Sequence, residues 1–117
     1  MKVFEREAGR LLRDIGVPQH LSGCGYLVEA VVLAAEEPAI LRNITGGLYP
    51  AVARRHHTTP ACTERAMRRA IESAWSHSDP DVLALYFGNS VNPIRGKPAN
   101  SQFIACLSRA LRQEVVS

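Results

Sequence analysis

Apolar residues recur three and four positions apart along most of this 117-residue chain, and no strand-like alternation of apolar and polar residues persists anywhere. This spacing predicts helices throughout. Hydrophobic residues make up 46% of the sequence and charged residues 21%, a balance typical of folded globular proteins. Because 117 residues suffice for one small domain and leave no room for a second, we expect a single compact all-α domain over residues 1–117.

Breaks in the apolar periodicity divide the chain into six expected helices. Thr59 before Pro60 and Asp79 before Pro80 are typical helix starts, because the polar side chain accepts an unpaired amide and proline has no amide to lose. Asn100 is expected to cap the last helix. The six helices are expected at about residues 3–15, 24–36, 45–56, 60–77, 80–86 and 101–114.

The spacing of cysteines and histidines predicts neither a disulfide nor a metal site. Cys24, Cys62 and Cys106 are odd in number and far apart, so we expect free, reduced and buried thiols. His56 and His57 are adjacent, and adjacent side chains on a helix point about 100° apart, which keeps the pair from sharing a metal ion.

The sequence carries no pattern typical of an enzyme or of a membrane protein. No nucleophile stands near a base, and the glycine pair at 46–47 lacks the context of a phosphate-binding loop, so we expect no catalytic residue and no cofactor. The longest apolar run covers residues 30–35, whereas a membrane-spanning helix needs roughly 20 residues. Without an apolar signal segment at the N-terminus, the expectation is a cytoplasmic protein with no membrane contact.

Positive charge is concentrated in the middle of the chain. The net charge is +3, yet residues 54–69 alone hold five arginines against one glutamate. At helical spacing, Arg65, Arg68 and Arg69 share one open side of the helix expected at 60–77. Guanidinium groups suit phosphates and guanine edges, which favours DNA as a partner. The alternatives are a merely solvated helix side and a protein-interaction module whose arginine side binds an acidic protein.

The helices expected at 45–56 and 60–77 are joined by only a few residues, as in a helix-turn-helix that places its second helix in the major groove. Ala53 has the small side chain that such a unit needs, and Thr63 points inward. His57 stands where the turn normally has glycine. A plain antiparallel helix pair is the alternative structural interpretation.

Taken together, these segments resemble the C-terminal effector domain of the sporulation-initiation response regulator, the master transcription factor of endospore-forming bacteria. The resemblance spans almost the whole chain and follows the order of the family. It is carried by IGVPQHLSGCGYLVEA (15–30), ILRNITGGLYPAVA (40–53), ERAMRRAIESAWS (64–76), FGN (87–89) and KPANSQFIA (97–105).

The resemblance implies a six-helix DNA-binding domain with a helix-turn-helix at about 45–77, whose recognition helix at about 60–77 reads a box containing a CG step. Glu64, Arg65 and Arg68 look like the base-reading residues of the family. An arginine can bond guanine O6 and N7 while a glutamate accepts from cytosine N4, so neighbouring side chains of these types can read a CG step. The residues expected at flanking or backbone positions on DNA are Thr59, Cys62, Arg69, Arg54, Arg55, Arg95 and Lys97. The family pattern has arginine at the position of Cys62.

The resemblance also implies partners. Residues 78–91 are similar to the family region that contacts an RNA polymerase sigma factor. The full-length regulator has an N-terminal receiver domain, which 117 residues cannot include, so we expect no phosphorylation switch in this chain. Without that domain the protein is expected to be mostly monomeric in solution and to form a dimer on tandem DNA boxes, where DNA raises the local concentration of the second copy.

Overall fold

The computed structural model describes residues 2–88 and 96–116, and every regular element in these ranges is helical. A 3₁₀ helix, η1 (Pro38–Arg42), and a π-helical turn, η2 (Ile44–Leu48), lead from the second α-helix into the third. The α-helices of the described ranges are α1 (Lys2–Ile15), α2 (Ser22–Glu36), α3 (Tyr49–Arg55), α4 (Pro60–His77), α5 (Pro80–Phe87) and α6 (Asn100–Val116). The prediction of an all-α fold with six helices is confirmed.

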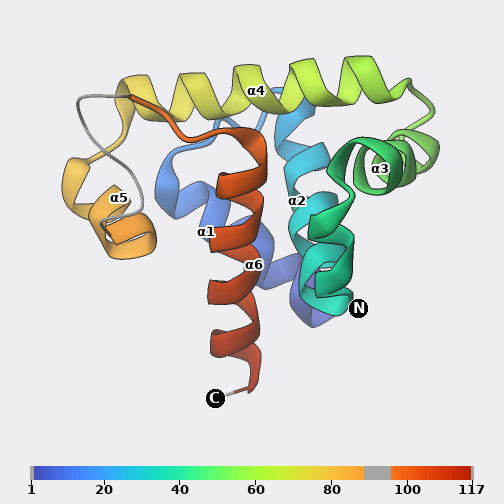
Figure 1. The fold of residues 1–117 in the computed structure, drawn as a ribbon. Coiled ribbons are helices and arrows are strands. Elements are labelled where there is room, and N and C mark those ends of the chain that lie inside the picture. The colour runs from blue at the N-terminus through green and yellow to red at the C-terminus, as the bar shows by residue number, and fades with distance from the viewer. Residues whose placement is uncertain (1, 89–95, 117) are drawn as a thin grey trace.

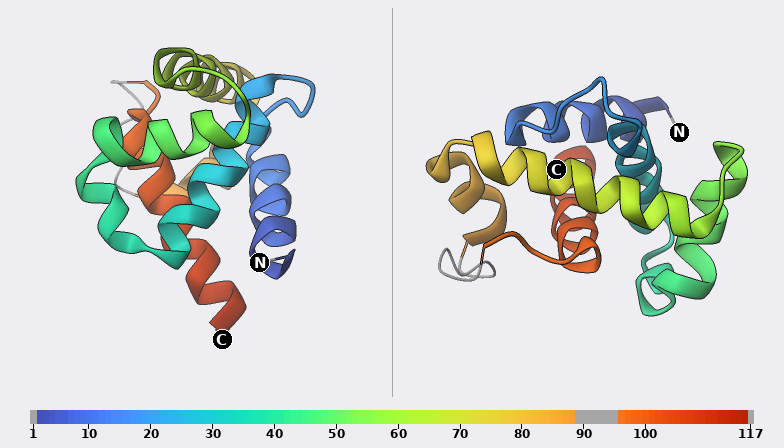
Figure 2. Two further views of the ribbon diagram at one scale, coloured as in Figure 1. Left: turned by 90° about the vertical axis from the view of Figure 1, so that its right-hand side faces the viewer. Right: turned by 90° about the horizontal axis from the view of Figure 1, so that it is seen from above.

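Helix α4 lies across one end of a bundle formed by α1, α2 and α6 (Figure 1). The short helix α3 packs beneath the N-terminal part of α4, and α5 follows at its C-terminal end. The view from above shows α4 crossing over the other helices, α6 among them (Figure 2). One long side of α4 therefore faces outward from the molecule.

Helix α2 is the centre of the bundle and packs against α1, α4 and α6. It is apolar nearly all round, and Leu27, Ala30 and Val31 are completely buried. A helix that is hydrophobic on every side is stable only where neighbours cover it, which explains its central place. None of the helices in the described ranges is long and apolar enough to cross a membrane.

The N-terminus of α2 touches α4 so closely that only glycine fits at the contact. A Cβ atom built on Gly23 would lie 2.1 Å from the carbonyl oxygen of Ala66 and 2.9 Å from the Cβ of Ala70. The helix expected from about residue 24 begins earlier, at Ser22, so Gly23 is not a loop residue. This residue lies inside α2, where the missing side chain lets the two helix backbones approach.

The third helix starts later than its apolar pattern suggests. A continuous helix over 45–56 is expected from the sequence, but the chain forms η2 first, and α3 begins only at Tyr49. The Asn43 Oδ1 atom accepts a hydrogen bond from the Gly46 amide at 3.2 Å, which stabilises the π-helical turn. Pro50 then falls in the first turn of α3, where its missing amide proton leaves no hydrogen bond unmade.

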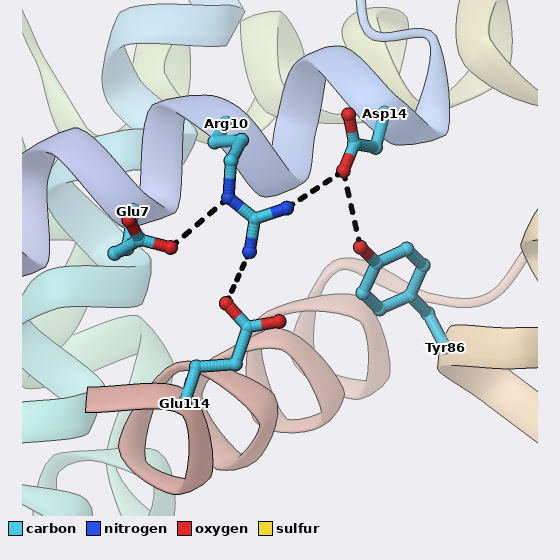
Figure 3. A network of polar contacts seen from close by, with 5 residues as sticks. All are labelled: Glu7, Arg10, Asp14, Tyr86 and Glu114. Carbon is cyan, nitrogen blue, oxygen red and sulfur yellow. Dashed lines mark hydrogen bonds and ion pairs between the residues drawn. The ribbon is translucent and has the colours of Figure 1, made fainter. Parts of the chain in front are cut away.

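A polar network on the surface joins α1, α5 and α6 (Figure 3). Arg10 binds Glu7 and Asp14 at 3.0 Å each and also forms an ion pair with Glu114 of α6. The hydroxyl of Tyr86 donates to Asp14 at 3.3 Å. These bonds raise the pKa of Arg10 and lower that of Glu7. This polar network links α1 to α5 and α6 at a site away from α4.

Candidate nucleic-acid interface

Residues 56–59 turn the chain from α3 into α4. The backbone of His57 has φ 54°, in the left-handed region that favours glycine, and no other non-glycine residue of the described ranges has a positive φ. The His56 amide donates to the Val52 carbonyl at 3.1 Å, and the Thr58 amide donates to the Ala53 carbonyl at 3.0 Å. Histidine thus occupies the glycine position of a closed helix-turn-helix turn.

The inward residues on either side of the turn, in α3 and α4, pack as a helix-turn-helix requires. Ala53 is only 2% exposed, and Thr63 is completely buried. The Thr63 hydroxyl donates to the Thr59 carbonyl at 2.9 Å, so the buried polar group has a partner within its own helix. A threonine is therefore compatible with this interior position.

Helix α4 begins and ends at the predicted residues, Pro60 and His77. Thr59 caps it, because its Oγ1 atom accepts a hydrogen bond from the Cys62 amide at 3.1 Å. The local signals of the sequence therefore place the start of this helix correctly.

Helix α4 has a buried side and an outward side. Five residues face the core: Thr63, Met67, Ala70, Ile71 and Ala74. At 100° per residue, Arg65 and Arg69 lie opposite this buried stripe, and both are exposed. Arg68 and the half-buried Glu64 lie together at one flank of the helix. The predicted base-reading residues thus share the outward and flanking surface of α4.

Two of these side chains bind each other. The Nη1 atom of Arg68 lies 2.8 Å from Glu64 Oε1, one helical turn away. Exposed ion pairs at this spacing contribute about 0.3–0.5 kcal/mol, so the pair can open at small cost. Arg65 and Arg69 form no ion pair with any other described residue, and their guanidinium groups are available to a ligand.

The predicted flanking residues differ in their surroundings. Arg54 is exposed at the end of α3, whereas Arg55 forms an ion pair with Glu29 of α2. Lys97 lies beside α4, with its Nζ atom 3.9 Å from Glu72 Oε1. Arg95 is outside the described residues.

Cys62 is exposed in the first turn of α4 and Cys106 is half-buried, so the prediction of three buried thiols is correct only for Cys24. Hydrogen bonds from the side chains of Thr59 and Thr58 lower the pKa of the Cys62 thiol. Burial instead raises the pKa of Cys24. No disulfide joins the three cysteines, and in the described ranges no three His, Cys, Asp or Glu side chains gather as a metal site would require.

Asn100 connects α6 to the helix-turn-helix, a role that its sequence position does not predict. It is the first residue of α6 rather than its cap, and it is 7% exposed. Its Nδ2 group donates to the Tyr49 hydroxyl and to the Glu64 carbonyl, at 3.1 Å each. Burial raises the pKa of that Tyr49 hydroxyl. Asn100 therefore fixes α3 and α4 relative to the start of α6.

The sequence pattern of one protein family matches the chain from α1 to α6. The family, described as Sporulation initiation factor Spo0A C terminal, matches residues 9–111. The chain belongs to this family. The resemblance found in the sequence is thus confirmed, and with it the assignment to DNA-binding regulators of sporulation initiation, a family of regulator domains rather than of enzymes. In this member of the family, the helix that follows the turn presents an arginine-rich side outward.

Proposed function

We propose that residues 1–117 act as one sequence-specific regulator of transcription, in which α4 enters the major groove of double-stranded DNA. The observation that carries the proposal is the outward side of α4, where Arg65 and Arg69 have no ion-pair partner among the described residues. An α-helix with its side chains is about 10–12 Å across, and the major groove is about 12 Å wide. The helix crossing the end of the bundle is therefore free to enter the groove (Figure 1).

Glu64, Arg65 and Arg68 are the proposed base-reading residues, and a CG step is the proposed target. The free guanidinium of Arg65 can bond guanine O6 and N7, and the Glu64 carboxylate can accept from cytosine N4, at about 1–3 kcal/mol per good contact. The ion pair between Arg68 and Glu64 holds both side chains at the same flank. Both are thus partly ordered before DNA binds.

The remaining predicted residues are proposed to contact the DNA backbone or to flank the bases. Arg55 must first release Glu29, whereas Arg54 carries no such restraint. Cys62 is exposed in the first turn of α4, which we propose enters the major groove, but it has no guanidinium group to contact a phosphate or a base. This set consists of Arg54, Arg55, Thr59, Cys62, Arg69, Arg95 and Lys97.

Fluorescence anisotropy with two labelled duplexes tests the proposal. A duplex with the CG-containing box should bind at least 10³-fold more tightly than a scrambled duplex of equal length, the low end of the usual specificity ratio. Equal affinities at moderate salt would contradict sequence reading. Binding to an acidic protein together with no salt-dependent binding to DNA would support the alternative function, a protein-interaction module.

Two alanine variants separate base reading from backbone contact. Arg65→Ala should lose about 1–3 kcal/mol on the box duplex and reduce discrimination. Lys97→Ala should weaken both duplexes alike and reduce the salt slope by about one. Arg6→Ala is the matched control, because Arg6 is an exposed cation in the N-terminal half of α1. That half of the helix lies away from α4 (Figure 1). An equal loss of discrimination in the Arg65 and Lys97 variants would refute the assigned roles.

The proposed protein partner is an RNA polymerase sigma factor at α5. Leu85 is 78% exposed there, beside a groove of about 430 Å³ between α5 and α6 that Cys106 and Arg109 also line. Leu85→Asp should abolish activation in a transcription assay with purified components and leave DNA affinity unchanged. Unchanged activation would refute the proposal that a sigma factor binds at α5.

We also propose that two copies pair on DNA with tandem boxes but not in its absence. Boxes at helical-repeat spacing raise the effective concentration of the second copy. Sedimentation of micromolar protein should show a monomer without DNA and a two-to-one complex on the tandem duplex. A dominant dimer without DNA would contradict the proposal.

A further inference from the structure

A polar groove of about 670 Å³ lies beside the recognition helix, between the η1–η2 segment, α4 and the start of α6. Glu64 and Arg68 form its wall on α4, so the groove adjoins the proposed base-reading surface. Lys97 and Ser101 line the opposite side, before and in the first turn of α6. Arg42, at the end of η1, lines it from the third side.

The charge of this groove is positive. Arg42, Arg68 and Lys97 line it, and the single acidic residue in the lining, Glu64, is paired with Arg68. Glu72, outside the lining, lies 3.9 Å from Lys97, which among the described lining residues leaves Arg42 as the unpaired cation. Arg42 is exposed and forms no ion pair within the described part of the chain. The hydroxyl of Ser101 and the amide of Asn43 add neutral polar groups. Such a lining suits an extended polyanion rather than an apolar ligand.

The walls of the groove are held in place before any ligand binds. Asn100 lies at its boundary and bonds both the Tyr49 hydroxyl and the Glu64 carbonyl, at 3.1 Å each. The first bond holds the start of α6 against α3, and the second holds it against α4. A preformed site loses less conformational entropy on binding than one that must first become ordered.

We propose that this groove binds the sugar-phosphate backbone of DNA at one edge of the major groove, and that Arg42 is a phosphate contact opposite Lys97. The inference rests on the proposed function. A helix about 10–12 Å across nearly fills a major groove about 12 Å wide, so a DNA backbone must pass each flank of α4. The Glu64–Arg68 flank is the one that opens onto the positive groove.

Salt titration of Arg42→Ala tests the inference, with affinities measured on box and scrambled duplexes from 50 to 200 mM NaCl. Loss of one phosphate contact reduces the salt slope by about 0.9. If the variant and the parent protein converge at 1 M salt, the expected loss is about fifteenfold at 50 mM and about fourfold at 200 mM. The loss should be the same on both duplexes, and Arg42→Lys should restore the slope.

A second pair of variants tests the groove by adding charge instead of removing it. Ser101→Glu places a carboxylate at the groove, at a helix start where acidic residues favour folding. Gln102→Glu adds the same charge one residue later, on an exposed position that does not line the groove. Ser101→Glu should weaken binding to both duplexes at least as much as Arg42→Ala does, and Gln102→Glu should weaken it much less.

The outcomes separate this inference from the proposed function. If the parent protein discriminates between the duplexes and shows a salt slope that Arg42→Ala leaves unchanged, the groove does not bind the backbone. Equal effects of Ser101→Glu and Gln102→Glu would overturn the inference as well. If the parent protein itself shows neither discrimination nor a salt slope, the proposed function has failed.

Discussion

The substitution Gly23→Ala should destabilise this domain, although alanine is the better helix former. A methyl group at residue 23 would lie 2.1 Å from the Ala66 carbonyl oxygen and 2.7 Å from the carbonyl carbon. These are backbone atoms in the middle of α4, which cannot move aside as a flexible side chain can. Helices α2 and α4 would have to separate by roughly 1.5 Å to restore ordinary contact distances.

The magnitude follows from two opposing effects. Overpacking of a well-packed contact costs about 1–3 kcal/mol, and the greater helix propensity of alanine offsets at most about 1 kcal/mol of this. Because both clashing atoms belong to the backbone, we take the upper end of the overpacking cost, about 3 kcal/mol. Subtracting about 1 kcal/mol for helix propensity leaves an expected net loss of about 2 kcal/mol. For a domain of this size, 2 kcal/mol corresponds to a fall in Tm of about 8 °C.

Gly9→Ala is the matched control for the same substitution. A Cβ atom on Gly9, inside α1, would meet nothing within 4 Å. This variant should be more stable than the parent protein by about 0.5–1 kcal/mol. Thermal and urea unfolding followed by circular dichroism measure both variants. If Gly23→Ala is as stable as Gly9→Ala, the close contact between α2 and α4 does not limit the fold.

Three further predictions concern the cap, the polar network and the thiols. Thr59→Ala should destabilise the domain by about 1 kcal/mol in urea unfolding and Thr59→Ser should not, since the bond to the Cys62 amide is a helix cap. Arg10→Ala should lower Tm less in 1 M than in 0.05 M NaCl, because salt screens the ion pairs that the variant removes. The fall in Tm caused by the variant should also become smaller as pH falls through the lowered pKa of Glu7, because protonation neutralises that carboxylate. An equal effect at all salt concentrations would contradict an ionic network. Iodoacetamide should alkylate Cys62 faster than Cys24 at pH 7.5 by mass spectrometry, because the pKa of the first thiol is lowered and that of the second raised; similar rates would refute this.

Features set by neighbouring residues could be predicted from the sequence. The pair Thr59–Pro60 marks the start of α4, and its apolar period separates the buried stripe from the side that carries Arg65 and Arg69. Both signals are local, because capping and helical periodicity act over a few residues. The number and order of the helices follow from the same signals.

Features that depend on distant segments could not be predicted. From the sequence, Gly23 is expected to precede the second helix. The structure places it inside α2, where contact with α4 leaves no room for a side chain. The sequence predicts that Asn100 caps the last helix. Its side chain instead donates a hydrogen bond to the hydroxyl of Tyr49, which lies 51 residues away in the chain.

The groove beside α4 illustrates the same division between sequence and structure. Arg42 and Lys97 belong to different segments, and no motif spacing relates them, but both line one groove with Arg68. The sequence alone therefore determined which helices form and which side of α4 is charged. Only the tertiary structure decided which distant side chains meet around it, because those contacts depend on how whole helices pack together rather than on the residues beside them.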